Sequence, residues 1–523
     1  MAHFIEEYWL KNSHLWGGEM ITRFPPEPNG HSHAGHAKAM WASFGMAEKF
    51  GGRCHLRMDD TNPEKESEAY ADSIKEMVAW MGFKWDGDVK HTSDYFDELH
   101  ALAVELIKSG DAYMDFTSRE KMREMRGTLN SPGERCEDAE NFADWHLDMF
   151  EHMRDGAFDD GECVLRARID MASPNMNMRD PVLYRVKKMA HNRTGDKWCI
   201  YPAYSYAHPA SDYIERIALS LCTLEFEDLR PFYDWVVERC IKFMPHADGR
   251  HPPMELEFAR LELDRGMTSK RKINALVESG SVDGWDDPRL VTLAGLRRRG
   301  FTPSSIRKFC EEGGLSKSNA TTPFSRMEDF LRLDLDPVAP RRVVVANPVA
   351  LDVIDGAEGL GEARMANHPK NEEMGSRPFA TSSRWWVDAS DVRAAGRAEK
   401  GFKRVEPGSI FRIMPGVVLE CVGVEVDASG APVKVMAKMS DGKPRSSIHG
   451  LAREVALPVE IWEPAPISES EGNADGPEPM LHGFAEPSCM GVEGAWQAIR
   501  YGYCSWDLKV PNRLILAVGL RGV

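Results

Sequence analysis

The chain has few cysteines, and they are scattered. Ten occur in 523 residues, with no C-x-x-C pair and no spacing typical of a small disulfide framework. Disulfides persist in oxidising compartments, so a chain without such a framework fits a reduced one. We therefore expect a cytoplasmic protein.

Long hydrophobic runs are also missing. No uninterrupted apolar stretch reaches the ~20 residues that a membrane-spanning helix needs. The first residues carry acids and lack the apolar segment of a secretory signal. The sequence therefore predicts a protein that neither spans a membrane nor is exported.

Positive charge is scarce. The sequence has 65 Lys and Arg against 82 Asp and Glu, a formal net charge of −17. This argues at first sight against a nucleic-acid partner, because phosphate binding depends on Lys and Arg. Basic residues nevertheless gather at residues 297–299, at Arg307 with Lys308, and at Arg341 with Arg342. Such islands can hold a polyanion on an acidic body, although solvated helix faces explain each island equally well.

The N-terminal region alternates strands and helices. Residues 19–24 and 54–58 have the pattern of short strands, and apolar residues at helical spacing follow each of them. The second helix is expected to begin at Asn62-Pro63 and to end at Gly82. This order predicts a parallel sheet, whose ligands bind beyond the carboxyl ends of the strands.

The rest of the chain has three regions that differ in their expected secondary structure. Residues 100–202 are mixed and helix-rich, and the apolar stretch 214–226 is expected to return to the first sheet, so we interpret 100–202 as an insertion. Helices are expected after residue 270, one of them starting at Thr302-Pro303. Beyond residue 340, β-branched runs between Gly, Pro and Asp-Gly turns predict antiparallel sheet or barrel, and residues 468–479 are expected to form a mobile loop.

Two histidines and a glycine open the first helix. His33, Gly35 and His36 stand where a helix N-terminus attracts phosphate through its free N–H groups. Histidines there can donate hydrogen bonds to a triphosphate, and a glycine lets a nucleobase or sugar approach the backbone. A transition-metal site made of His31, His33 and His36 is the alternative, but no Cys or carboxylate completes its ligand set nearby.

A second polar segment, GMTSKRK at residues 266–272, carries a lysine that could reach a polyphosphate. Five segments in order then resemble the glutaminyl-tRNA synthetases: RFPPEPNGHSHAGHAK, LRMDDTNPEKE, CTLEF, SKRK and VDGWDDPRLVTLAGLRRRG. The resemblance runs from about Phe4 to the C-terminal VGLRG. The residues HAGH at 33–36 match the H-I-G-H motif of class I synthetases, and TSKR at 268–271 matches the M-S-K-R form of the K-M-S-K-S loop.

The resemblance implies a multidomain α/β plus all-β protein. Its expected parts are a Rossmann-type catalytic domain in two halves (1–99 and 203–265), an inserted acceptor-stem-binding domain (100–202), a helical connector with the SKR loop (266–338) and two C-terminal antiparallel β-barrels that read the anticodon (339–523). It also implies a monomeric ligase that joins glutamine to tRNA(Gln) and uses ATP and Mg²⁺.

The resemblance assigns roles to individual residues. His33, His36 and Lys270 are implied as catalytic, and Asp59, Tyr204, Arg23 and His208 as the glutamine pocket, with Asp59 on the α-ammonium group and Tyr204 on the side-chain amide. The implied ATP site consists of Glu27, Pro28, Asn29, His33, Ala34, Gly35, His36, Ala37, Lys38, Ala39, Thr223, Arg260, Leu261, Thr268, Ser269 and Lys270. Arg341, Arg404 and Arg412 are implied for tRNA binding, and no protein-held metal is expected.

The chain departs from the family pattern at several positions. The departures are Thr268 for a usual Met, Arg216 for Gly, Ala218-Leu219 for Thr-His, Ser205 for Asp, Met414 for Arg, and the loss of an S-P-Y-R-D-R stretch near residues 133–138. Arg216 raises the sharpest question, because a cation beside the pocket can block it or add unpaired charge. Glutamate-tRNA ligation, a tRNA-binding homologue without catalysis, and a metal-dependent hydrolase remain the alternatives.

Overall fold

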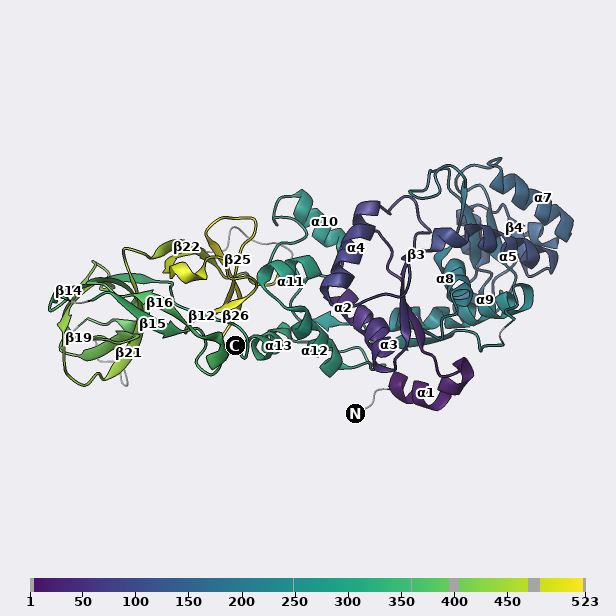
Figure 1. Ribbon diagram of the computed structural model, residues 1–523. Coiled ribbons are helices and arrows are strands. Elements are labelled where there is room, and N and C mark those ends of the chain that lie inside the picture. Colours follow the sequence, from purple (N-terminus) through teal and green to yellow (C-terminus); the bar gives the residue numbers. More distant parts are fainter. Residues whose placement is uncertain (1–3, 248, 359, 395–403, 469–479, 521–523) are drawn as a thin grey trace. The chain divides into compact units, whose positions relative to one another are not determined.

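The computed structural model describes residues 4–247, 249–358, 360–394, 404–468 and 480–520 (Figure 1). The chain forms two compact units, residues 1–262 with 310–322, and residues 263–309 with 323–523. No helix in these described ranges is long and apolar enough to cross a membrane. The expected loop at 468–479 falls, beyond Ser468, outside the described residues.

A parallel sheet forms the centre of the first unit. Its strands are β1 (Ile21–Phe24), β2 (Arg53–Met58) and β3 (Lys90–His91), paired in that order, and the parallel pair β8 (Leu219–Thr223) and β9 (Met254–Phe258). The Ala218 amide donates to the Ile21 carbonyl oxygen at 2.8 Å, so β8 returns beside β1. The predicted parallel sheet and the predicted return of residues 214–226 are both confirmed.

Two helical segments follow the first two strands. The first consists of α2 (Ala34–Met40), a wide turn (Trp41–Gly45) and α3 (Met46–Lys49), and the second is α4 (Glu68–Trp80). The predicted start of α4 at Asn62-Pro63 is wrong. The Glu66 carboxylate accepts from the Asn62 amide at 2.7 Å and holds this segment as a loop, and Ser67 caps the helix instead. The predicted stop is confirmed, since Gly82 has a φ of 80° that favours glycine.

An antiparallel sheet lies within the predicted insertion. Its strands are β4 (Ala112–Asp115), β5 (Val164–Ala167), β6 (Val182–Val186) and β7 (Ile200–Pro202). The accompanying helices are α5 (Phe96–Lys108), α6 (Arg119–Met125), α7 (Ala143–Arg154), α8 (Tyr204–Ile214) and α9 (Arg230–Phe243). One apolar core of aromatic and aliphatic residues joins this sheet to α5, α7, α8 and α9.

Helices open the second unit, as predicted. They are α10 (Lys270–Glu278), α11 (Leu293–Arg299), α12 (Pro303–Gly313, which continues into the first unit) and α13 (Phe324–Leu335). Arg297 of the basic island on α11 is exposed, but the other two arginines are not on a solvated face. Arg298 is buried and bonds Asp507 at 2.9 Å, while buried Arg299 bonds Glu328 at 3.0 Å. These two arginines hold the unit together and present no charge for phosphate.

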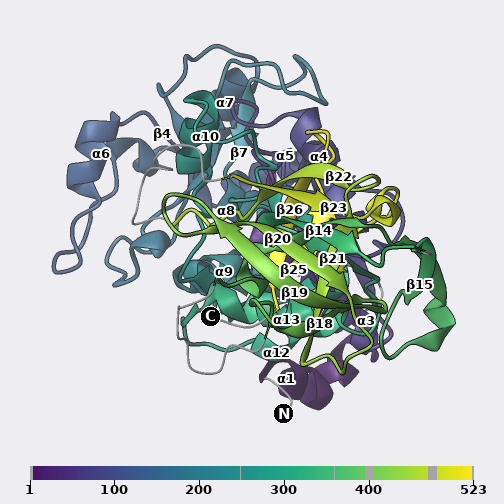
Figure 2. The ribbon, with the colours of Figure 1, turned by 90° about the vertical axis from the view of Figure 1, so that its left-hand side faces the viewer.

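Two β-structures complete the second unit. A closed barrel contains, in order, β14 (Pro348–Asp355), β17 (Arg384–Asp388), β21 (Ser446–Ala452), β18 (Ile410–Met414), β19 (Val417–Val426) and β20 (Pro432–Met439), and Figure 2 looks onto several of these strands. A seven-stranded sheet contains β12 (Arg341–Arg342), β24 (Trp496–Ala498), β25 (Gly502–Trp506), β26 (Arg513–Gly519), β22 (Leu457–Trp462), β23 (Met480–Ala485) and β13 (Val344–Val345). Its edge strands β12 and β13 are joined by Val343 alone, so this sheet nearly closes as a second barrel.

Candidate functional site

The histidine motif forms the first turn of α2. His33 is the N-cap, and its Nδ1 accepts from the Gly35 amide at 3.1 Å, while Nδ1 of His36 accepts from the His33 amide at 3.1 Å. Both neutral rings therefore carry their proton on Nε2, as donors suited to phosphate oxygens. A Cβ on Gly35 would lie 2.9 Å from Cε1 of His33, so glycine is required for this arrangement.

The alternative metal site is not formed. His31 turns to α4, where its Nδ1 lies 2.8 Å from the Ser73 hydroxyl and its ring packs edge-on against Tyr70. Within the described residues, the group with metal-ligand spacing is Asp115, Cys136 and Asp138 in the insertion.

Separate local contacts hold several of the predicted ATP residues in place. Asn29 bonds the Glu27 carboxylate, and the Pro28 carbonyl oxygen accepts from the Ser67 amide at 3.0 Å. Buried Lys38 donates to the Ala259 carbonyl oxygen at 2.7 Å, which ties α2 to the segment with Arg260 and Leu261. Thr223 is the last residue of β8, which runs parallel to β9. It therefore lies at the carboxyl-end edge of the sheet, where β9 also ends. Thr268, Ser269 and Lys270 belong to the second unit, where Ser269 and Lys270 begin α10.

The four predicted glutamine-pocket residues form one cluster. Buried Arg23 donates to Nε2 of His208 at 2.6 Å, and Nδ1 of His208 lies 3.4 Å from the Asp59 carboxylate. Because Nε2 accepts, the neutral His208 ring carries its proton on Nδ1, facing Asp59. Burial lowers the pKa of His208 and keeps it neutral. The ring of Tyr204 lies 5.1 Å from that of His208, one helical turn away.

Sequence reasoning missed the residues that support this cluster. The Asp212 carboxylate accepts from Arg57 at 2.7 Å, from Arg23 at 3.1 Å and from the Tyr233 hydroxyl at 3.0 Å. Burial alone would raise the pKa of Asp212, but the charges of Arg23 and Arg57 hold it well below its usual range. The spacing of Tyr204, His208 and Asp212, four residues apart on one face of α8, was a signal that could have identified Asp212.

Arg216 has a different role from the one that the sequence suggested. It follows α8 with a φ of 63°, in the left-handed region that favours glycine. The family's usual glycine therefore suits this position because glycine adopts the left-handed backbone conformation at the end of the helix without strain. The carboxylate of the neighbouring Glu215 contacts His55 and Arg57, each at 3.2 Å. It is therefore engaged with residues other than Arg216.

Other departures are accommodated locally. Ala218 and Leu219 are buried in an apolar core at the start of β8. Ser205 is half-buried in the first turn of α8. Met414 shares the less buried face of β18 with Arg412.

The three predicted tRNA-binding arginines are not equivalent. Arg341 is buried, donates to the Ala339 carbonyl oxygen at 3.0 Å and pairs with Asp336 at 2.8 Å, so its charge is not presented to solvent. Arg404 is partly exposed and pairs with Asp391 at 2.5 Å. Burial thus argues against the interpretation of Arg341 as a phosphate contact, whereas Arg404 and Arg412 stay predictions.

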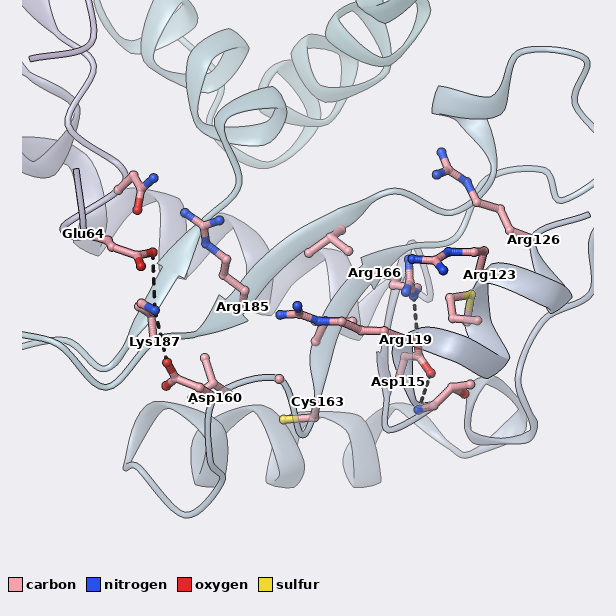
Figure 3. Close-up of a pocket in the computed structure, with 17 residues that line it drawn as sticks. Glu64, Asp115, Arg119, Arg123, Arg126, Asp160, Cys163, Arg166, Arg185 and Lys187 are labelled. Carbon is pink, nitrogen blue, oxygen red and sulfur yellow. Dashed lines mark hydrogen bonds and ion pairs between the residues drawn. The ribbon is translucent and has the colours of Figure 1, made fainter. Parts of the chain in front are cut away.

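A basic pocket in the insertion was also missed. A cavity of about 440 Å³ lies between α6 and the strands β5 and β6, and Figure 3 shows the side chains around it. Arg119, Arg123 and Arg185 line it without a hydrogen-bond or ion-pair partner among the described residues, while Arg166 is neutralised by Asp115 at 2.5 Å. The pocket can therefore receive an anion. The spacing of Arg119, Arg123 and Arg126, on one helical face, was its sequence signal.

Comparisons with known proteins identify the family. Residues 19–337 match the catalytic domain of the class I tRNA synthetases (E and Q), and residues 339–440 match the anti-codon binding domain of the same synthetases. The chain is 43% identical to the glutamine–tRNA ligase of Nitrosomonas europaea, over 97% of this chain and 95% of that protein. It is 45% identical to that of Escherichia coli O157:H7, over 96% and 93%. A solved glutamate–tRNA ligase from Elizabethkingia meningosepticum is 16% identical, with a TM-score of 0.44 over 61% of this chain and 70% of that one.

Proposed function

The chain belongs to the glutamine–tRNA ligase family of class I tRNA synthetases, and on that premise we propose that it joins glutamine to the 3′ end of tRNA(Gln) with ATP. The observation that carries the proposal is the cluster of buried Arg23, Asp59 and His208 with half-buried Tyr204. These four residues, assigned separately by resemblance, converge on one place at the carboxyl ends of β1 and β2.

Activation brings two anions together. The glutamine carboxylate forms a bond to the α-phosphorus of ATP and pyrophosphate leaves, so the protein must position the reactants and balance their charge. The Nε2–H groups of His33 and His36 at the start of α2 supply donors for the phosphates. Mg²⁺ that arrives with ATP would share the phosphate charge.

The SKR loop completes the proposed chemistry. By resemblance, Thr268, Ser269 and Lys270 act on the phosphates during activation. In the transfer step, the terminal ribose hydroxyl of the tRNA attacks the activated carbonyl carbon and AMP leaves. The motif alone supports this role of Lys270, and a lysine that neutralises developing charge should affect turnover more than binding.

The amino acid is recognised through buried polar groups. Asp59 is proposed to hold the α-ammonium group, and the Tyr204 hydroxyl to meet the side-chain amide, with Arg23 and His208 fixing the pocket around them. Buried polar groups of this kind reject an analogue whose hydrogen-bonding pattern leaves them unpaired.

The tRNA is proposed to use two surfaces. The basic pocket with Arg119, Arg123 and Arg185 suits the phosphates of the acceptor end, because its cations have no protein partner in the described part of the chain. Arg412, on β18 of the closed barrel, and Arg404, in the segment before β18, are proposed to contact the anticodon arm.

Charging of purified tRNA with labelled glutamine or glutamate, with and without ATP, tests the proposal. We expect ATP-dependent attachment of glutamine. Equal or faster attachment of glutamate would instead indicate a glutamate-tRNA ligase, and tRNA binding without charging would indicate a homologue that has lost catalysis.

A further inference from the structure

A loop at residues 59–67 joins the two proposed substrate sites. It begins at Asp59, the proposed partner of the glutamine α-ammonium group, whose amide donates to the Pro26 carbonyl oxygen at 3.0 Å. It ends at Ser67, whose amide donates at 3.0 Å to the carbonyl oxygen of Pro28, one of the proposed ATP residues. The loop contains no helix or strand. The position of each end therefore depends on contacts with other segments.

A tight turn in the insertion contacts this loop near both of its ends. Residues 191–195, which we call the clamp turn, lie in the hairpin between β6 and β7, and their first and last residues exchange backbone hydrogen bonds at 2.9 and 3.0 Å. Nε2 of His191 donates to the Asp60 carbonyl oxygen at 2.9 Å, and the Asn192 side chain donates to the Glu66 carbonyl oxygen at 2.6 Å. Both acceptors are backbone atoms, so these contacts fix the path of the loop.

The His191 side chain is a fixed hydrogen-bond donor. It is 2% exposed, and its ring packs against Phe96 and Tyr201 at centroid distances of 5.6 and 6.0 Å. Its Nδ1 accepts from the amides of Arg193 at 3.2 Å and Thr194 at 3.3 Å, so the neutral ring carries its proton on Nε2, toward the loop. Burial lowers the pKa of His191 and keeps the ring neutral. The ring cannot turn without breaking these contacts.

Side-chain contacts extend the same arrangement to Asp59. The Asp60 carboxylate accepts from the Ser93 amide at 2.8 Å and from its hydroxyl at 2.6 Å, while the Thr92 hydroxyl donates to the Asp59 carboxylate at 3.2 Å. Arg193, in the clamp turn, donates to the Ser93 hydroxyl oxygen at 2.8 Å. The clamp turn thus reaches the neighbour of Asp59 through its backbone and through its side chain.

We infer that the clamp turn positions the loop for both substrates, with His191 fixing Asp59 for glutamine and Asn192 fixing the end of the loop beside Pro28 for ATP. The inference rests on the proposed glutamine–tRNA ligase function. Neither residue touches a substrate in this role, since each acts through the backbone of the loop. A binding group that is held by its neighbours loses much of its effect when it is displaced by about 1 Å.

Steady-state charging of tRNA(Gln) by the full chain, with glutamine or ATP varied, tests the role of His191. His191→Phe keeps a ring against Phe96 and Tyr201 but removes the donor. Its KM for glutamine should rise about tenfold, while kcat and KM for ATP change less than about threefold. His191→Gln loses the ring but places an amide donor at the reach of Nε2, so it should recover most of the wild-type KM. A role in packing alone predicts the reverse order of the two variants.

Asn192→Ala tests the other end of the loop. Loss of its hydrogen bond should raise KM for ATP about threefold to fivefold and leave KM for glutamine within about twofold of the wild type. Because Asn192 is exposed, this variant keeps the core intact and decides the inference if His191→Phe fails to fold. Lys197→Ala is the matched control, since exposed Lys197 lies in the same hairpin but pairs with Asp97 of α5 at 2.6 Å. Neither KM should change in the control.

Hydrogen exchange of residues 59–67 in the full chain reports on the loop independently of activity. Exchange should be about tenfold faster in His191→Phe than in the wild type, and close to the wild type in His191→Gln and Lys197→Ala. Unchanged exchange and KM in His191→Phe, or equal losses in His191→Phe and His191→Gln, would overturn the inference and leave the ligase function standing. If the wild type charged no glutamine while His191→Phe still loosened the loop, the proposed function would fall and the clamp turn would stand.

Discussion

Two groups of arginines in the first unit show how differently the same side chain can be used. In the proposed glutamine pocket, Arg23 is fully buried and donates from every guanidinium nitrogen to protein acceptors. In the insertion, Arg119, Arg123 and Arg185 surround a cavity, and they lack protein partners within the described ranges. The first arrangement shapes a site, whereas the second leaves charge available to an external anion.

The difference follows from the cost of burying charge. A buried cation must be paired and hydrogen-bonded, so Arg23 comes with Asp212, and Asp212 comes with Arg57 and Tyr233. A cation at an open cavity keeps its hydration until a ligand replaces it. Removing a charge should therefore disrupt folding at the first place and binding at the second.

The largest expected effect is that of Asp212→Asn. Loss of the carboxylate leaves two buried guanidinium groups short of their partner, which should lower the free energy of unfolding by about 3–5 kcal/mol. Denaturant unfolding and glutamine affinity measure the effect. Tyr233→Phe, which removes one hydrogen bond to the same carboxylate, is the control and should lower stability by only about 1 kcal/mol. Equal losses in the two variants would show that Asp212 is not the electrostatic centre of the pocket.

Lys270→Ala tests a cation that belongs to neither group. If Lys270 balances charge in the transition state, its loss should lower the rate of charging by ~10²-fold or more and change glutamine binding little. Single-turnover charging at saturating ATP measures the rate. The neighbouring Lys272→Ala, on the same helix, serves as the control. An unchanged rate in Lys270→Ala would remove the loop from the proposed mechanism.

Local sequence patterns predicted part of the fold and of the site. The strand–turn–helix around His33 and His36 depends on neighbouring residues, and the sequence predicted it together with the parallel sheet. The role of Arg57 depends on contacts between distant segments, so no local pattern revealed it. The spacing on α8 could have identified Asp212 as a neighbour of His208, but not its pairing with Arg23 and Arg57. The same limit explains why Arg298 and Arg299 were wrongly interpreted as phosphate contacts or solvated residues. Their partners, Asp507 and Glu328, are remote in sequence.

Replacing Arg119, Arg123 and Arg185 by glutamine should weaken tRNA binding and leave other properties unchanged. We expect the affinity for tRNA to fall by about tenfold near 0.1 M salt, and the salt dependence of binding to become shallower by up to about 3 in slope. KM for glutamine and the unfolding midpoint should stay unchanged, because these side chains have no partner in the described protein to lose. Glutamine at exposed Lys84, Lys108 and Lys242 provides a control of equal charge. Equal weakening by both sets would indicate a diffuse charge effect without a defined site.

Arg216→Gly should have the smallest effect. Arg216 belongs to neither group of arginines, and this substitution separates the strain of its backbone from the effect of its charge. A side chain at the φ of 63° found there is disfavoured by roughly 1–2 kcal/mol relative to glycine. The substitution should therefore raise the free energy of unfolding by about 1 kcal/mol, less whatever the guanidinium contributes. Arg216→Ala is the matched variant, because it removes the same guanidinium but keeps the Cβ, so it should be less stable than the glycine variant. Neither should change KM for glutamine. If KM fell in both variants while their stabilities stayed equal, the guanidinium of Arg216 would be acting on the pocket, and the backbone explanation would be wrong.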